Sequence, residues 1–363
     1  MRLLLAGGGT GGHLFPAVAL AQTLLQQDSD SAVHFIGTEK GLEATMLPKL
    51  GFPLSTVAMV GVVGRGWRGK LEMIPRLVKS MLQAKAYIKE FRPDMVVGVG
   101  GYSSVPVLLT AKLKGIPYAI HEQNAFPGLS NKLLSKWAKR IFLSYPDSGN
   151  SFDQRKVRVT GNPLRAGLET IAEQLPEPGK LLIFGGSRGA RAINQTVMEM
   201  LPLLCDWPEK PIILHQTGSD DFAEVSRAYA AAGFDPQQVV PFIDDMATAY
   251  AEAKLVVCRA GATTLAELTI AGRPAVLIPY PHAAADHQTA NARTLEVAGA
   301  AKLLPQTELT AASLSQLVKS MLVDKEGLQQ MASAGRKLAQ PGAAEKILNE
   351  CRQVVGATLL GAN

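Results

Sequence analysis

Short apolar runs alternate along the whole chain with longer segments in which apolar residues recur at helical spacing. The short runs are rich in Val, Ile and Leu and predict buried strands, whereas the longer segments predict helices. Strands are expected at residues 3–6, 33–37, 95–99, 118–121, 141–144 and 157–160, and again at 181–184, 212–216, 239–242, 255–258, 275–279 and 301–304. Helices are expected between them, among others at 16–25, 74–91, 131–138, 191–201 and 264–271. This alternation predicts an α/β fold of parallel sheets with helices on both faces.

The two series of strands follow one plan. Each begins with a strand, a glycine-rich turn and a helix, at residues 5–12 and 184–191, and a polar stretch at 169–179 resembles a linker. We therefore expect two Rossmann-like, doubly wound domains, residues 1–162 and 163–342, which face each other across a cleft. Their ligands would lie at the carboxyl ends of the strands. A last helix, about residues 343–363, is expected to pack back on the first domain.

Composition and charge narrow the class of protein. At 363 residues the chain is longer than one hydrophobic core supports, and 47% hydrophobic with 19% charged residues is typical of a folded protein. A net charge of +6 favours an anionic partner such as a phosphate, a nucleotide or an acidic lipid surface, and no nucleic acid is expected. Three widely spaced cysteines suit a reducing compartment, and no apolar run is long enough to span a bilayer. A cytoplasmic location is expected.

The first glycine-rich turn, residues 7–13 (Gly-Gly-Gly-Thr-Gly-Gly-His), joins a strand to a helix. Its backbone amides and the helix N-terminus suit an anion. It lacks the Lys-Ser/Thr ending of a P-loop and the ribose-binding acid of a dinucleotide fold. His13 stands at the start of the helix, where it would be either a general base or a capping and packing residue.

The second half contains two further turns of this kind. Residues 185–191 again join a strand to a helix, and residues 259–267 follow the strand at 255–258. Thr263 or Thr264 is expected to cap that helix, with a diphosphate at its N-terminus, and Glu267 would accept hydrogen bonds from ribose hydroxyls. The plainer alternative is a capped helix with a solvated glutamate. Amide side chains at residues 286–291 would bind sugar hydroxyls or form an ordinary polar helix turn.

Metal chemistry has little support in the sequence. The histidines are dispersed, and no paired-cysteine or His-Glu-x-x-His motif occurs. Three acidic pairs, Asp28/Asp30, Asp220/Asp221 and Asp244/Asp245, are interpreted as surface turns.

One segment suggests contact with a membrane surface. The stretch from Trp67 to Lys89 combines a tryptophan with apolar residues at helical spacing and with basic residues on the same helix. Such helices lie in the headgroup region of anionic lipid. An ordinary surface helix with its apolar face in the core is the alternative. The apolar residues are Ile74, Leu77, Val78, Met81 and Leu82, and the basic ones are Arg76, Lys79, Lys85 and Lys89.

Six segments in order along the chain resemble the MurG family of peptidoglycan N-acetylglucosaminyltransferases, which convert lipid I to lipid II. They are residues 7–13, 98–104 (Gly-Val-Gly-Gly-Tyr-Ser-Ser), 121–124 (His-Glu-Gln-Asn), 161–165 (Gly-Asn-Pro-Leu-Arg), 185–190 (Gly-Gly-Ser-Arg-Gly-Ala) and 259–262 (Arg-Ala-Gly-Ala). The resemblance implies a two-domain GT-B fold, UDP-N-acetylglucosamine as donor, an inverting mechanism and no cofactor or metal. It also implies a peripheral position on the inner face of the cell membrane.

The resemblance also implies roles for single residues. The first domain would bind the acceptor and the membrane, and the second would bind the UDP-sugar. The donor site would comprise Thr10, Gly11, Gly12, Asn124, Arg165, Ser187, Ile243, Ala262, Thr263, Thr264, Leu265, Glu267 and Gln288. The lipid I diphosphate would be received by Gly11, His13, Gly100, Gly101 and Tyr102. The family often has Gln where this chain has His287, so the role of that position stays open.

His13, or a base that it orients, would take the proton from the acceptor hydroxyl, and Glu122 is the second candidate for that role. Three other classes of protein remain as alternatives: a UDP-N-acetylglucosamine 2-epimerase or glycolipid glucosyltransferase of the same fold, a non-catalytic nucleotide-sugar sensor or membrane scaffold, and a dinucleotide oxidoreductase. The oxidoreductase is disfavoured because the first turn lacks the Gly-x-Gly-x-x-Gly order.

Overall fold

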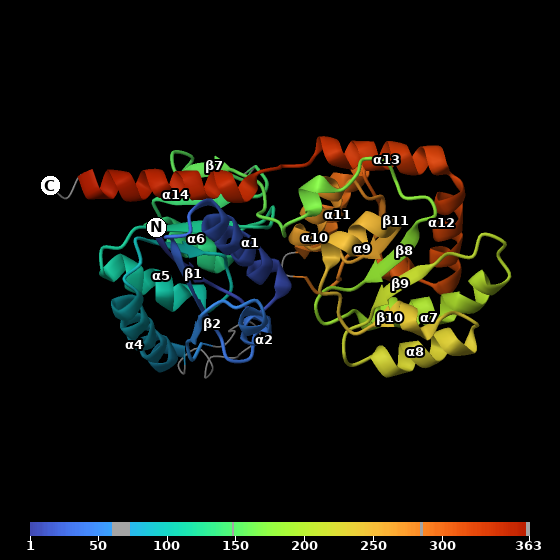
Figure 1. Cartoon of the computed structure of the whole chain (residues 1–363), viewed down its shortest axis with the longest axis horizontal. Coiled ribbons are helices and arrows are strands. Elements are labelled where there is room, and N and C mark those ends of the chain that lie inside the picture. Colours follow the sequence, from blue (N-terminus) through green and yellow to red (C-terminus); the bar gives the residue numbers. More distant parts are fainter. Residues whose placement is uncertain (60–72, 147–148, 284–285, 361–363) are drawn as a thin grey trace. The chain divides into compact units, whose positions relative to one another are not determined.

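The computed structural model describes residues 1–59, 73–146, 149–283 and 286–360 (Figure 1). They form two compact units. Unit 1 comprises Met1–Arg165 together with Gly342–Asn363, and unit 2 comprises Ala166–Pro341. The chain therefore passes from unit 1 to unit 2 and back, so that unit 2 is an insertion in unit 1.

Unit 1 is built on a parallel sheet in the order β3-β2-β1-β4-β5-β6-β7. Its inner strands are buried on both faces, since Leu3 to Ala6 and Met95 to Val97 have no more than 1% of their surface exposed. The strands are β1 (Arg2–Ala6), β2 (Ala32–Gly37), β3 (Leu54–Thr56), β4 (Met95–Gly98), β5 (Tyr118–Glu122), β6 (Arg140–Leu143) and β7 (Val157–Val159). The helices are α1 (Gly11–Gln27), α2 (Leu42–Lys49), α4 (Met73–Phe91), α5 (Ser104–Leu113), α6 (Leu129–Ser135) and α14 (Ala343–Leu360).

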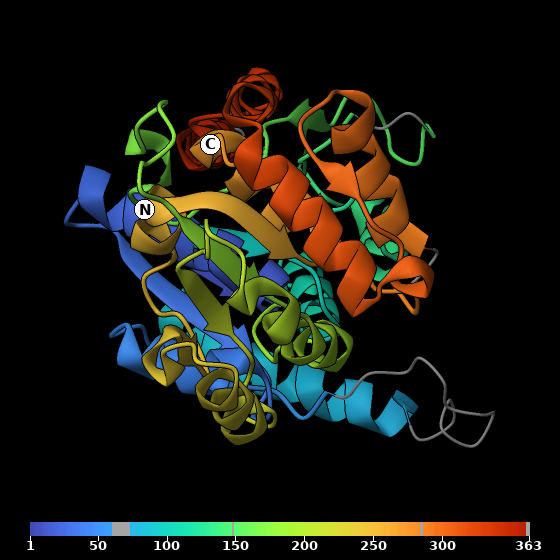
Figure 2. The ribbon, with the colours of Figure 1, turned by 90° about the vertical axis from the view of Figure 1, so that its right-hand side faces the viewer.

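Unit 2 repeats the plan with a parallel sheet in the order β10-β9-β8-β11-β12-β13. Its helices α7 and α12 pack side by side and close one part of the core (Figure 2). The strands are β8 (Lys180–Phe184), β9 (Ile213–Gln216), β10 (Val239–Val240), β11 (Ala253–Cys258), β12 (Ala275–Leu277) and β13 (Lys302–Leu303). The helices are α7 (Arg191–Cys205), α8 (Phe222–Ala231), α9 (Met246–Glu252), α10 (Ala262–Ala271), α11 (His287–Val297), α12 (Ala311–Val323) and α13 (Lys325–Lys337).

The parallel sheets and the repeated plan predicted from the sequence are confirmed. Each predicted strand is present, and the structure adds β3, whose Leu-Ser-Thr sequence is too short and polar to stand out as an apolar run. In both sheets the strand order reverses between the first strand and the fourth, at β1/β4 and at β8/β11. Ligands of doubly wound sheets bind beside such a reversal, so these two points position the candidate site.

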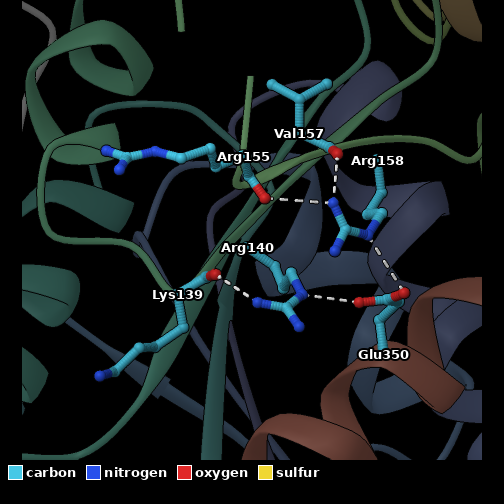
Figure 3. Close-up of polar contacts among 6 residues, drawn as sticks. All are labelled: Lys139, Arg140, Arg155, Val157, Arg158 and Glu350. Carbon is cyan, nitrogen blue, oxygen red and sulfur yellow. Dashed lines mark hydrogen bonds and ion pairs between the residues drawn. The ribbon is translucent and has the colours of Figure 1, made fainter. Parts of the chain in front are cut away.

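Helix α14 returns to unit 1 and packs against α1. Glu350 of this helix accepts hydrogen bonds from Arg140 of β6, at 2.6 Å, and from Arg158 of β7, at 3.2 Å (Figure 3). Further along the helix, Arg352 donates to the side chain of Gln27. One carboxylate thus joins two strands and the terminal helix of the same unit.

Candidate active site

Two loops of unit 1 meet at the reversal point between β1 and β4. A side chain at Gly7 would collide with Val99 and with the backbone of Gly100, and one at Gly101 would lie 2.7 Å from the Gly8 carbonyl oxygen. Gly100 and Gly101 also have φ angles of +95° and +81°, which favour glycine. The first glycine loop (residues 7–10) therefore packs backbone against backbone on the loop after β4. This contact brings the residues predicted to receive a diphosphate to one place.

His13 lies in the first turn of α1, against Gly100. Its Nδ1 is 3.3 Å from the Thr10 hydroxyl. Burial lowers the pKa of His13, while the charges of Glu122 and Glu43 and the nearby Gly8 backbone oppose this shift in part. The imidazole is therefore neutral near pH 7 and able to accept a proton.

Glu122 ends β5 and is surrounded by donors. Its Oε1 accepts hydrogen bonds from the backbone and side-chain amides of Asn124, both at 3.1 Å. Its Oε2 accepts from the Gly128 backbone at 3.0 Å and from the Asn131 amide at 2.7 Å. These four donors fix the carboxylate in place, so that it holds the loop after β5.

Arg165 is the last residue of the first segment of unit 1. Its guanidinium lies 3.5 Å from the centre of the Phe15 ring on α1. The sequence analysis assigned Arg165 to the second domain, whereas the structure joins it to the first through this cation–π contact. Gly11 and Gly12 open α1 after Thr10, and Tyr102 follows the loop after β4, so all four lie beside His13 at the strand ends.

Unit 2 has a second glycine loop (residues 185–190) between β8 and α7. Gln216, at the end of β9, donates to the carbonyl oxygen of Gly186 at 2.8 Å and accepts from the backbone amide of Ile243 at 3.0 Å. Ile243 and Gly186, the residue before Ser187, are thus connected through one buried amide side chain; Ser187 and Ile243 are both predicted donor-binding residues.

Helix α10 begins at Ala262 with Gly261 as its N-cap residue, and no side chain caps it. The predicted capping role of Thr263 or Thr264 is wrong, because both lie inside the first helical turn. The solvated-glutamate alternative for Glu267 is also wrong: Glu267 is 3% exposed, and the Tyr250 hydroxyl donates to its Oε2 at 3.1 Å. Ala262, Thr263 and Leu265 are buried beside it, and Thr264 is partly exposed.

Helix α11 follows β12 and begins at His287. The side chain of Gln288 accepts a hydrogen bond from the Tyr280 backbone at 2.9 Å, which fixes its amide group. Asn291, one turn further on, is buried and lies 3.5 Å from the Ala260 carbonyl oxygen in the turn before α10. The residues predicted to bind a nucleotide sugar therefore gather around the strand ends of unit 2.

Several other interpretations were tested by the structure. Asp28 and Asp30 form a turn at the end of α1, as expected. Asp221 is not a surface turn: it is 8% exposed and accepts from Arg191 and Asn194, because its carboxylate supports the start of α7. Within the described parts of the chain, no three His, Cys, Asp or Glu side chains gather as a metal site, and no helix is both long and apolar enough to traverse a lipid bilayer.

The predicted membrane segment is described only in part, because residues 67–72 lie outside the described residues. On α4, Ile74, Val78 and Leu82 are 62%, 53% and 62% exposed, and they form a stripe at helical spacing. Arg76, Lys79, Lys85 and Lys89 are exposed on the same helix. Leu77 packs against the core of unit 1 together with the buried Ala84 and Ile88, so α4 has one apolar face in the core, as in the alternative interpretation, and a second apolar stripe exposed.

Three residues that contact the predicted site are not apparent from the sequence: Glu43, Gln216 and Tyr250. Each is buried, and each contacts a loop or residue that the sequence had already singled out. The one signal for Glu43 is an acidic residue in the first turn of a helix that follows two closely spaced glycines.

Comparison with known proteins agrees with this geometry. Residues 3–143 match the glycosyltransferase family 28 N-terminal domain, and residues 180–347 match the family's C-terminal domain. A protein of Syntrophotalea carbinolica named UDP-N-acetylglucosamine--N-acetylmuramyl-(pentapeptide) pyrophosphoryl-undecaprenol N-acetylglucosamine transferase is 53% identical over 98% of this chain and 99% of its own length. The protein of the same name from Geobacter sulfurreducens is 45% identical over 96% of this chain and 98% of its own.

Solved structures show the same fold. The crystal structure of Acinetobacter baumannii MurG superposes with a TM-score of 0.73 at 35% identity, and the match covers 97% of this chain and 99% of that one. A UDP-GlcNAc 2-epimerase from Neisseria meningitidis, solved with UDP-GlcNAc, has a TM-score of 0.63 at 14% identity over 97% of this chain and all of that one. At that identity the epimerase shows the GT-B fold alone.

Proposed function

The chain belongs to glycosyltransferase family 28, and we propose that it transfers N-acetylglucosamine from UDP-N-acetylglucosamine to the C4 hydroxyl of the N-acetylmuramyl group of lipid I, which yields lipid II. The observation that carries this proposal is full-length identity of 53% to a transferase of that name, in a chain that also has His13 at the reversal point of its first sheet.

Unit 2 would hold the donor. Ser187, Ile243 and Gln288 are fixed by backbone contacts at the strand ends, and Glu267 is oriented by Tyr250 toward the ribose hydroxyls. The N-terminus of α10, from Ala262 to Leu265, would face the diphosphate, because helix N-termini stabilise negative charge. The same amides would stabilise UDP as it leaves, when the charge on its terminal phosphate grows.

Unit 1 would hold the acceptor and the base. The loops at Gly11, Gly100 and Gly101 would receive the lipid I diphosphate, and Thr10, Gly12, Asn124 and Arg165 would complete the donor site. Neutral His13 takes the proton of the attacking hydroxyl, and that oxygen displaces UDP from the anomeric carbon with inversion. Glu122 contributes a fixed negative charge that stabilises the protonated imidazole.

No metal is required in this scheme, since backbone amides and helix dipoles neutralise the diphosphate. The exposed stripe of α4 and the basic residues on the same helix support a position at the cytoplasmic face of an anionic membrane, where the lipid acceptor would lie.

The decisive experiment is transfer of radiolabelled N-acetylglucosamine from its UDP donor to a short-chain lipid I analogue in the presence of a chelator. We expect a labelled disaccharide lipid, and no conversion of the donor when the acceptor is omitted. Donor binding without product would favour a sensor, conversion of donor alone would favour an epimerase, and transfer to glycolipid only would replace lipid I as acceptor.

A further inference from the structure

A fully buried carboxylate lies beneath the first glycine loop. Glu43, in the first turn of α2, has 0% of its surface exposed. Its Oε2 accepts a hydrogen bond from the Gly9 amide at 2.7 Å, and its Oε1 accepts from the Thr38 amide and hydroxyl, both at 2.8 Å. Burial of a charge is tolerated only when donors surround it, and here three donors do so.

Three glycines surround the Glu43 side chain and leave room for it. Side chains at Gly8, Gly37 or Gly41 would all overlap its carboxylate group. An acidic residue near the N-terminus of α2 stabilises the helix dipole, but an acid that faces solvent would do this equally well. The bond to Gly9, which is 34 positions away in the sequence, has no part in forming α2. This hydrogen bond connects the Glu43 carboxylate to the first glycine loop, which leads into the helix of His13.

The Gly9 amide and the Gly8 carbonyl belong to one peptide unit. A trans peptide is planar, so its N–H and C=O point in opposite directions. Glu43 accepts the N–H, and the Gly8 carbonyl points to the other side, where a side chain at Gly101 would contact it. Gly8 and Gly9 have φ angles of +150° and +91°, at which glycines offer little resistance to rotation of the peptide. The carboxylate therefore decides which way the Gly8 carbonyl points.

We propose that Glu43 is a positioning residue for the transfer reaction, which acts on His13 by fixing the first glycine loop, whose Thr10 hydroxyl lies 3.3 Å from Nδ1 of His13. The carboxylate holds the loop in one conformation, the Thr10 hydroxyl meets Nδ1, and Nε2 is left to accept the acceptor's hydroxyl proton. This role rests on the proposed function, because it needs His13 to be the base.

The test compares Glu43→Gln with Glu39→Gln, a matched control that removes an exposed carboxylate from the turn before α2. Glu43→Gln is expected to lower kcat by about 10–100-fold, the usual effect of removing the outer partner of a functional histidine, with UDP binding unchanged. Glu39→Gln is expected to match the unaltered enzyme. Equal kcat in both variants would overturn the proposal.

The pH profile separates positioning from simple loss of folding. The ionisable groups facing His13 are Glu43 from α2 and Glu122 and His121 from β5. Glu43 raises the pKa of His13, so its removal should move the acidic limb of kcat to lower pH. A lower kcat with an unmoved limb and a lower Tm would mean that Glu43 is only structural.

A measurement on the unaltered protein covers the case in which Glu43→Gln does not fold. The Gly9 amide proton should exchange slowly and resonate far downfield, because a buried carboxylate accepts it. Rapid exchange would overturn the proposal. Absence of transfer by the unaltered enzyme, or full activity of His13→Ala, would instead refute the proposed function.

Discussion

The two glycine loops lie at equivalent points of their sheets, but they are held by different chemistry. The first glycine loop follows β1 and is held by Glu43, an anion on the helix after β2. The second follows β8 and is held by Gln216, a neutral amide at the end of β9. β2 and β9 occupy the same place in the two strand orders, but the support comes from the helix after the strand in unit 1 and from the strand end in unit 2, and it is a carboxylate only in unit 1.

The charge of the supporting group matches the proposed role of each loop, which is catalysis in unit 1 and donor binding in unit 2. Beneath the first loop, a negative charge supports a histidine that becomes positive during the reaction. Beneath the second, a carboxylate would repel the diphosphate of the donor: two unit charges about 8 Å apart repel by on the order of 2 kcal/mol at an effective dielectric constant of about 20. A neutral amide holds the loop without this cost. The same repulsion would act between Glu43 and the lipid I diphosphate, but in unit 1 the charge also supports the histidine.

The largest effect is expected on kcat, from loss of the candidate base His13. His13→Ala should lower kcat by about 10²–10⁴-fold, as expected for loss of a general base, and leave UDP-N-acetylglucosamine affinity nearly unchanged. Steady-state kinetics with calorimetric donor binding would measure both. If donor affinity fell together with kcat, the assignment of catalysis to the first loop and of donor binding to the second would be refuted.

Replacing the neutral amide beneath the second loop by a carboxylate tests the comparison of the two loops directly. Gln216→Glu should weaken donor binding by roughly tenfold to a hundredfold, because it places a charge beneath the second loop. Gln237→Glu, an exposed change of equal charge in the same unit, should have little effect. Calorimetric titration with UDP would decide; equal affinity for both variants would show that charge at this position is irrelevant.

A smaller effect is expected where unit 2 orients the ribose. Tyr250→Phe removes the hydroxyl that donates to Glu267 and should raise the donor KM by about 2–13-fold, equivalent to about 0.5–1.5 kcal/mol. The loss should shrink with a 2′-deoxyuridine donor, which lacks one hydroxyl for Glu267 to bind. An equal loss with both donors would mean that Tyr250 serves packing alone.

The smallest functional effect is expected far from both loops, at Glu350. Burial raises the pKa of this carboxyl, but the hydrogen bonds and charges of Arg140 and Arg158 outweigh burial and lower it. The stabilisation is therefore complete above the unfolded value near 4.5 and is lost as pH falls through the lower folded pKa. Glu350→Gln should reduce the free energy of unfolding by about 1–3 kcal/mol at pH 7, with kcat unchanged. Chemical denaturation at pH 7 and below pH 4 would show whether the difference disappears in acid.

The sequence predicts what depends on local pattern. The strands and the glycine loops follow from apolar runs and turn residues that are neighbours in the chain, whereas the two reversal points came from the structure. Glu43 and Gln216 could not be found in this way, because their partners lie 27 to 34 positions away and are chosen by the tertiary fold. The capping role expected of Thr263 or Thr264 failed for a local reason: the helix starts one residue after Gly261, before either threonine can cap it.

The insertion of unit 2 into unit 1 has a consequence for synthesis. Unit 2 is one continuous stretch, Ala166–Pro341, so it is complete before the final helix has been translated. Unit 1 begins first but lacks α14, and with it the carboxylate of Glu350, until the end of translation. Domains usually fold in order from the N-terminus. Here the N-terminal unit is completed after unit 2, because its strands β6 and β7 gain their contacts with Glu350 only when α14 has been made.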